Sequence, residues 1–247
     1  MRVQEATVTA FDGTRLPMAN IMARFNAKAP RRILLAAHYD TRPWADEDKD
    51  ESKRRTPLDG ANDGASGVAV ILEIARNLQQ QAPGIGVDVL LTDVEDYGSH
   101  DDESTGESSW ALGAQYWAAH TPYTSARQRP AYGILLDMVG GRNASFCREY
   151  LSESVAPVVN SKVWQAARAE GISRFVDEQR GGVTDDHIFI NRAGIPCIDI
   201  IECANPETGS FPPTWHTTDD NIKNIDPSTL GDVGRTLMRV IYTESPQ

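Results

Sequence analysis

The chain has 247 residues, 40% of them hydrophobic and 24% charged, which is typical of a soluble globular protein. Its formal net charge of −11, from 24 basic and 35 acidic residues, argues against a nucleic-acid partner because phosphates are bound by cationic side chains. No apolar run approaches the roughly 18 to 20 residues that span a bilayer, and residues 1–13 lack the apolar segment of a signal peptide. The length fits a single catalytic domain, 1–247, which is large enough to bury a core without disulfides or a structural metal.

Strand-like and helix-like patterns alternate along the chain. Residues 1–31 are expected to form an N-terminal hairpin that packs on the domain and turns at Asp12-Gly13. The hydrophobic periodicity then predicts strands over 33–37, 87–91, 134–136 and 195–201, and helices over 66–78, 110–119, 155–170, 186–192 and 226–242. Residues 41–62 and 101–109 are polar and are expected to be loops. This order predicts a single α/β domain with a central, mostly parallel mixed sheet and helices on both faces.

The predicted central strands end in ionisable residues. His38 follows the strand over 33–37, Glu95 and Asp96 follow the strand over 87–91, and Asp137 follows the strand over 134–136. In open α/β sheets the binding crevice lies at the carboxyl ends of the strands, where loops bring distant residues together. We therefore expect the active site at this edge of the sheet.

Two further residues are candidate metal ligands. Asp63 lies in the segment GANDGASG just before a predicted helix, so it is either a helix cap or a ligand that small neighbours leave accessible. His216 follows Trp215 and precedes two acidic residues that could support it. Imidazole and carboxylate ligands suit a catalytic zinc with an open position. A thiolate cluster is not expected, because the three cysteines form no CxxC pair and their odd number leaves at least one free thiol.

Five short motifs occur in a fixed order: HYD at 38–40, GANDGASG at 60–67, ED at 95–96, LLD at 135–137 and WHT at 215–217. This set resembles the zinc aminopeptidase superfamily and its glutaminyl cyclase branch, from about residue 32 to the C-terminus. In the two-metal peptidases the resemblance implies five ligands, with Asp63 bridging the metals: His38, Asp63, Asp96, Asp137 and His216. In the cyclases it implies one zinc, held by Asp63, Asp96 and His216, with Glu95 as the proton shuttle.

Three features resemble the cyclase branch in particular. TDDH at 184–187 is similar to a segment whose first Asp, here Asp185, binds the substrate, and Phe211 matches an aromatic residue that lines the cyclase pocket. The loop HYDTRPWAD is most similar to bacterial cyclases. Trp215 is expected to form a pocket wall and Trp110 to close it. The chain departs from the animal enzymes at Asp96, where they carry a glutamate, and at Ala37, where they carry a disulfide cysteine.

The resemblance implies zinc-dependent cyclisation of the N-terminal glutamine of peptides or proteins to pyroglutamate, with release of ammonia. In this hypothesis Glu95 moves the proton, while Asp185, helped by Asp137, holds the amide nitrogen. The alternative is a two-zinc aminopeptidase that hydrolyses the N-terminal peptide bond. A non-catalytic binding domain with the same fold is a third hypothesis, whereas a serine hydrolase is not expected without a GxSxG motif. Similar bacterial enzymes are commonly exported to the periplasm; the oligomeric state is not predicted.

The remaining ionisable residues are assigned simpler roles. His100 and His120 are expected at the surface, His187 to be packed, and Asp40 to orient His38. Asp199 is an acid inside a buried apolar run and is either structural or a partner of the site.

Overall fold

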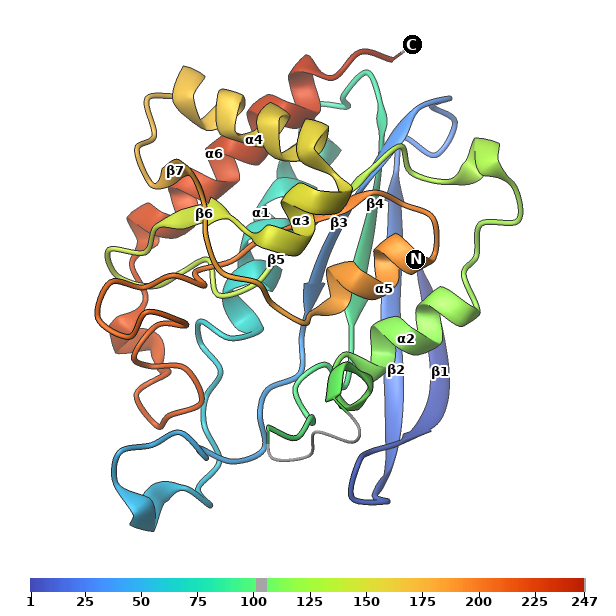
Figure 1. The fold of residues 1–247 in the computed structure, drawn as a ribbon. Helices are drawn as coiled ribbons and strands as arrows, with labels where there is room; N and C mark the ends of the chain where they lie inside the picture. The colour runs from blue at the N-terminus through green and yellow to red at the C-terminus, as the bar shows by residue number, and fades with distance from the viewer. Residues whose placement is uncertain (101–105, 247) are drawn as a thin grey trace.

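A six-stranded sheet in the order β1-β2-β4-β3-β5-β8 runs through the computed structural model, which describes residues 1–100 and 106–246 (Figure 1). Its strands are β1 (Arg2–Thr9), β2 (Arg15–Phe25), β3 (Arg32–His38), β4 (Gly86–Thr92), β5 (Gly133–Leu136) and β8 (Cys197–Ile200). β4, β3, β5 and β8 are parallel, whereas the hairpin of β1 and β2 joins β4 in antiparallel fashion. The predicted mixed, mostly parallel sheet is confirmed.

Helices cover both faces of the sheet (Figure 1). One face packs against α1 (Ala65–Gln80), with α4 (Pro157–Ala169) and α6 (Pro227–Thr243) beside it, and the other against α2 (Leu112–Ala119) and α5 (Asp186–Arg192). Alternate residues of β3 enter opposite cores, since Ile33 and Leu35 belong to the first cluster and Leu34 to the second. A strand buried on both faces has no polar side, which explains the continuous apolar run over 33–37.

The helix predicted over 155–170 is α4, and a short helix that was not predicted, α3 (Tyr150–Val155), precedes it. Pro157 begins α4, because a proline at the first helical position loses no hydrogen bond. β6 (Phe146–Arg148), before α3, and β7 (Phe175–Gln179), after α4, form a two-stranded parallel sheet that was not predicted. Short helical turns, also unpredicted, are η1 (Glu51–Lys53), η2 (Gly106–Ser109), η3 (Ala126–Gln128) and η4 (Ile222–Asn224).

The bounds of two other elements also differ slightly from the prediction. β8 is shorter than the predicted strand over 195–201, and α2 begins at Leu112 because Ala111 has a φ of 54°. Residues 101–105 of the predicted loop 101–109 lie outside the described residues. No helix within residues 1–100 and 106–246 combines the length and apolar character of a membrane span.

The start of α3 depends on a fully buried carboxylate, Glu149. This side chain accepts hydrogen bonds from the backbone N–H groups of Leu151 (2.8 Å), Ser152 (2.6 Å) and Val183 (3.1 Å), and the His187 ring lies 3.5 Å away. Burial alone would raise the pKa of Glu149, but the contacts with His187 and the amides outweigh it and lower the pKa to about 2. The ionised carboxylate therefore stabilises the folded state.

We expect Glu149→Gln to lower the free energy of unfolding at pH 7 by about 2–3 kcal/mol. Because the pKa of Glu149 is lower in the folded than in the unfolded chain, its contribution is complete above about pH 4.5 and is lost as the pH falls toward 2. Urea unfolding of metal-free protein from pH 7 to pH 2.5 measures this difference. Glu207→Gln, at an exposed position, is the control and should change little. A difference that does not shrink in acid would contradict the prediction.

Candidate active site

The carboxyl ends of the parallel strands bring the predicted site residues together. His38 is the last residue of β3, Glu95 and Asp96 follow β4, and Asp137 directly follows β5. Neighbouring parallel strands end at the same edge of a sheet, so residues separated by up to 99 positions meet there. The segment before α1 adds Asp63 to this edge.

Two groups of metal-ligating side chains share Asp63. In the first, the Nε2 atom of His216 lies 3.0 Å from Oδ1 of Asp96 and 3.5 Å from Oδ2 of Asp63. In the second, Nε2 of His38 lies 3.1 Å from Oδ1 of both Asp63 and Asp137. Within each group the ligand atoms lie within 4.8 Å of one another, and all five residues are buried. The structure therefore brings all five predicted ligand positions together.

The first group suits a divalent cation. One carboxylate oxygen of Asp96 is buried and has no hydrogen-bond partner in the described part of the chain. Burial, and then the neighbouring charge of Asp63, raise the pKa of Asp96 and bring that of Asp137 to about 6. A cation would balance this crowding of carboxylates. Carboxylates and imidazoles are zinc ligands, and three of them leave one position of a tetrahedral site open.

The backbone is strained beside the site. Val94, Met138 and His216 have φ angles of 53°, 48° and 52°, in the left-handed region that residues with a Cβ rarely adopt. Val94 precedes Glu95, and Met138 follows Asp137. Such strain persists where surrounding contacts fix the backbone, and it is commonly concentrated at functional sites.

Two carboxylates hold the loops that carry the candidate ligands. Asp40 accepts hydrogen bonds from the backbone N–H groups of Glu95 (3.0 Å) and Asp96 (3.1 Å). Asp220 accepts from the N–H groups of Asn62 (2.8 Å) and Asp63 (3.0 Å). Asp40 had been expected only to orient His38. Its backbone carbonyl does lie 3.2 Å from Nδ1 of that ring, but the side chain also fixes the loop after β4.

We expect Asp40→Asn to weaken zinc binding or turnover by roughly 10- to 100-fold, because one acceptor is replaced by an amide donor facing a backbone N–H. Chelator competition and steady-state kinetics measure the two effects. Asp59→Asn, at an exposed position of the same loop, is the matched control and should behave as the parent protein. Parent-like affinity and turnover in Asp40→Asn would show that the loop holds its shape without this carboxylate.

Arg42 and Asp46 lie beside His216, and neither was assigned a role from the sequence. The buried Arg42 guanidinium donates to both carboxylate oxygens of Asp46 and to the backbone carbonyls of Asp96 and Gly98. Asp46 in turn lies 3.6 Å from Nδ1 of His216. A carboxylate near one ring nitrogen favours a proton there, which leaves the other nitrogen free to bind a metal. The only sequence signal was the i, i+4 spacing of these opposite charges.

A cavity of about 230 Å³ opens beside the ligand groups. Glu95, Asp185, Trp110, Phe211 and Trp215 all line it, as predicted for a substrate pocket, and Trp215 stacks on the His216 ring at 3.9 Å. The volume is below the roughly 300–1,000 Å³ of pockets for drug-sized ligands, so it matches one amino-acid side chain.

The surface position predicted for His100 is correct but incomplete. His100 is exposed, as predicted, but it also lines the cavity, with ring centres 4.7 Å from Trp110 and 5.2 Å from Trp215. His120 is exposed, as predicted, and its ring hydrogen-bonds to the Tyr116 carbonyl one helical turn earlier. The mouth of the pocket therefore carries an imidazole that the sequence did not assign to it.

Two acidic side chains that line the cavity, Asp185 and Glu95, have raised pKa values. Burial, then the charge of Asp137, raises the pKa of Asp185 to about 7. Burial, then the charge of Asp185, raises the pKa of Glu95 well above its ordinary value. Carboxyl groups with raised pKa values are suited to general acid–base catalysis. Behind them lie fully buried Asp199 and His187, whose closest nitrogen–oxygen distance is 3.9 Å, so His187 is packed as predicted.

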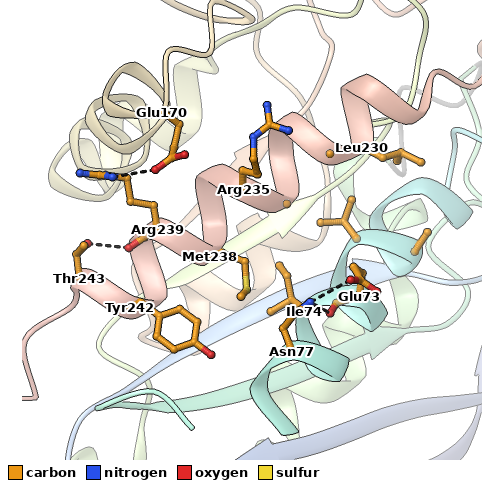
Figure 2. Close-up of a pocket in the computed structure, with 14 residues that line it drawn as sticks. Glu73, Ile74, Asn77, Glu170, Leu230, Arg235, Met238, Arg239, Tyr242 and Thr243 are labelled. Carbon is orange, nitrogen blue, oxygen red and sulfur yellow. Dashed lines mark hydrogen bonds and ion pairs between the residues drawn. The ribbon is translucent and has the colours of Figure 1, made fainter. Parts of the chain in front are cut away.

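A larger groove of about 820 Å³ lies between α1 and α6 (Figure 2). Its walls are mainly apolar, from Ile74, Leu230 and Met238, and the ion pair of Arg239 with Glu170 (2.8 Å) borders it. None of its lining residues is a histidine, a cysteine or a member of either ligand group. The smaller cavity, not the larger groove, therefore brings the candidate ligands and ionisable residues together.

Comparison with known proteins identifies the family and the fold. A profile of peptidase family M28 matches residues 20–241. The fold is similar to the crystal structure of Bacteroides thetaiotaomicron glutaminyl cyclase bound to N-acetylhistamine, with a TM-score of 0.94 and 49% identity over 99% of this chain and 84% of that one. It is also similar to a Zn-dependent exopeptidase from Parabacteroides distasonis, with a TM-score of 0.93 and 46% identity over 98% and 84% of the two chains.

A curated relative gives the same indication at lower identity. The glutaminyl-peptide cyclotransferase-like protein of Bos taurus is 26% identical over 244 residues, which cover 90% of this chain and 59% of that protein. The chain thus spans about three fifths of the length of this relative. The resemblance expected from the ordered motifs is confirmed.

Proposed function

Since this chain belongs to peptidase family M28, we propose that it is a zinc-dependent enzyme that cyclises the N-terminal glutamine of peptides or proteins to pyroglutamate. The observation that carries the proposal is a side-chain-sized pocket that Glu95 and Asp185 line together with one group of candidate zinc ligands. The likeness to a bacterial glutaminyl cyclase at 49% identity supports the same activity.

One zinc per chain would be held by Asp63, Asp96 and His216. When bound, it supplies Lewis-acid polarisation of the γ-carbonyl of the substrate glutamine. Zinc dependence also agrees with the zinc-dependent exopeptidase among the similar structures.

Glu95 is the proton carrier in this proposal. The α-amine attacks the γ-carbonyl carbon, a nitrogen–carbon bond forms, and Glu95 takes the proton that the amine loses. Glu95 then returns that proton to the departing amide nitrogen, which leaves as ammonia. A carboxyl group with a raised pKa is suited to both halves of this transfer.

Asp185, supported by Asp137, would hold the side-chain amide of the substrate in one rotamer. Because the reaction is intramolecular, holding the two reacting groups together supplies much of the rate increase. The aromatic walls Trp110, Phe211 and Trp215 would exclude water, whose attack would only deamidate the glutamine.

A two-zinc aminopeptidase is the second candidate function. The specific observation in its favour is the second ligand group, His38, Asp63 and Asp137, which shares Asp63 with the first. With two metals, Glu95 would act as the base for water attacking the first peptide bond. The two candidates use the same pocket and differ in metal number and product.

Mass spectrometry after incubation with a Gln-Xaa-Xaa peptide tests the proposal. Cyclisation removes one ammonia, so the expected product is about 17 mass units lighter than the substrate. Free glutamine with a shortened peptide would instead identify an aminopeptidase. A protein that binds no zinc and leaves the peptide unchanged would favour a non-catalytic binding domain.

A further inference from the structure

Two of the three cysteines lie in contact. Cys147 belongs to β6, and Cys203 follows the end of β8 by three residues. Their Sγ atoms are 3.6 Å apart, although 56 positions separate them in the chain. The third cysteine, Cys197, lies in β8, where its sulfur packs against Gly133. The pair is therefore a product of the tertiary fold.

The surrounding backbone fixes both thiols. Each S–H lies near the backbone carbonyl of Arg180, with sulfur–oxygen distances of 3.3 Å for Cys147 and 3.7 Å for Cys203. Gly181 has a φ of +65°, and a Cβ at this position would lie 2.7 Å from the Cys203 sulfur. A glycine is thus needed here for the chain to close over the pair. The two side chains have little freedom to move apart.

The pair is also chemically asymmetric. The hydrogen bond from Cys203 lowers the pKa of the Cys147 thiol, while the same contact raises the pKa of Cys203. A thiol whose thiolate form is stabilised is the better nucleophile toward a disulfide. Cys197 differs, because complete burial raises its pKa well above the ordinary value.

We propose that Cys147 and Cys203 form an intramolecular disulfide in the presence of a disulfide oxidant. The Cys147 thiolate attacks one sulfur of the oxidant and releases a thiol, and the Cys203 sulfur then displaces the second thiol from the mixed disulfide. The protein loses two protons and two electrons, which the oxidant gains as it becomes two thiols. Each sulfur needs to move by under about 1 Å to reach the bonding distance of about 2 Å.

The bond would lie directly behind a wall of the substrate pocket. Both cysteines belong to an apolar cluster whose other members include Met138, Val183 and Ile201, and these three residues line the cavity. Phe211 and Trp215, on the segment that follows Cys203, pack against the same cluster. Oxidation would therefore join β6 to the segment that carries the pocket aromatics. Closing a loop of this length restricts the unfolded chain and should raise the melting temperature.

The test uses the full chain, both folded and refolded from urea, in a buffer of reduced and oxidised glutathione. After denaturation without reductant, the expected product takes up one iodoacetamide group instead of three, and peptide mapping joins Cys147 to Cys203. Its melting temperature should exceed that of the dithiothreitol-treated protein by about 5–10 °C.

Three serine variants provide the controls. Cys197→Ser should still form the bond and keep the full shift in melting temperature, whereas Cys147→Ser and Cys203→Ser should form no bond and show no redox-dependent shift. Each variant is compared with itself under oxidising and reducing conditions, so a general loss of stability does not mimic the effect. Three alkylated cysteines after both treatments, a bond to Cys197, stable glutathione adducts, or a bond without a rise in melting temperature would overturn the proposal.

Discussion

Glu95→Gln is expected to lower kcat for glutamine cyclisation by a factor on the order of 10²–10⁴, the range typical of a lost general acid–base group. The substitution keeps the size of the side chain, but an amide neither accepts nor returns the proton that moves from the amine to the leaving nitrogen. Because Glu95 lies outside both ligand groups, the variant should retain its zinc, and KM should change much less than kcat. Steady-state kinetics together with zinc analysis measure these effects.

Glu207→Gln is the control for this experiment, since it makes the same chemical change at an exposed position. Its kinetics and zinc content should match those of the parent protein. A fully zinc-loaded Glu95→Gln protein with near-normal turnover would remove Glu95 from the mechanism, for the cyclase and the aminopeptidase alike. A pH profile adds a further criterion, because the pH dependence of kcat should change when a carboxyl group with a raised pKa is removed.

The position of the site could be predicted from the sequence because it follows from a rule of topology. A continuous apolar run such as 33–37 indicates a strand buried on both faces, and polar residues directly after it mark the carboxyl edge. His38 and Asp137 occupy such places, so their approach to within 3.1 Å required only that their strands be parallel neighbours. Asp63 lies before a helix, where the local sequence was equally consistent with a cap.

The supporting contacts could not be predicted, because they depend on loop conformation. Arg42 reaches Asp96 and Gly98 across more than 50 positions, and Asp220 reaches Asn62 across 158 positions. Neither hydrophobic periodicity nor a sequence motif specifies such pairs. The break between α3 and α4 is different, because Pro157 was a visible signal. β6 and β7 were missed because three and five residues are too few to give a periodic pattern.

The shared position of Asp63 explains why one arrangement suits two reactions. Its two carboxylate oxygens point to different histidines, Oδ1 toward His38 and Oδ2 toward His216. The same scaffold could therefore hold two metals or one. In the one-metal case, His38 and Asp137 would remain as a hydrogen-bonded pair beside the pocket. Substitutions of the two histidines separate these cases, whereas substitution of Asp63 would disturb both groups.

We expect His216→Asn to lose its zinc and to reduce turnover by more than about 10³-fold, because a ligand of the proposed metal is removed. His38→Asn is the matched change in the second ligand group. It should retain one zinc per chain and measurable cyclase activity. Metal analysis by mass spectrometry and cyclase kinetics on both purified variants measure the difference.

The zinc content of the parent protein is the reference for both variants. If it holds two zinc ions and His38→Asn holds one, the proposal of a single zinc is wrong and the aminopeptidase becomes the favoured function. If His216→Asn keeps its zinc and activity, the assigned ligand group itself is wrong. Circular dichroism of both variants distinguishes a specific loss of metal from unfolding, which matters because both imidazoles are buried. His38 and His216 are equally buried, so burial alone gives no reason for their variants to differ. A difference in zinc content between the two variants therefore distinguishes a cyclase site from a two-metal peptidase site.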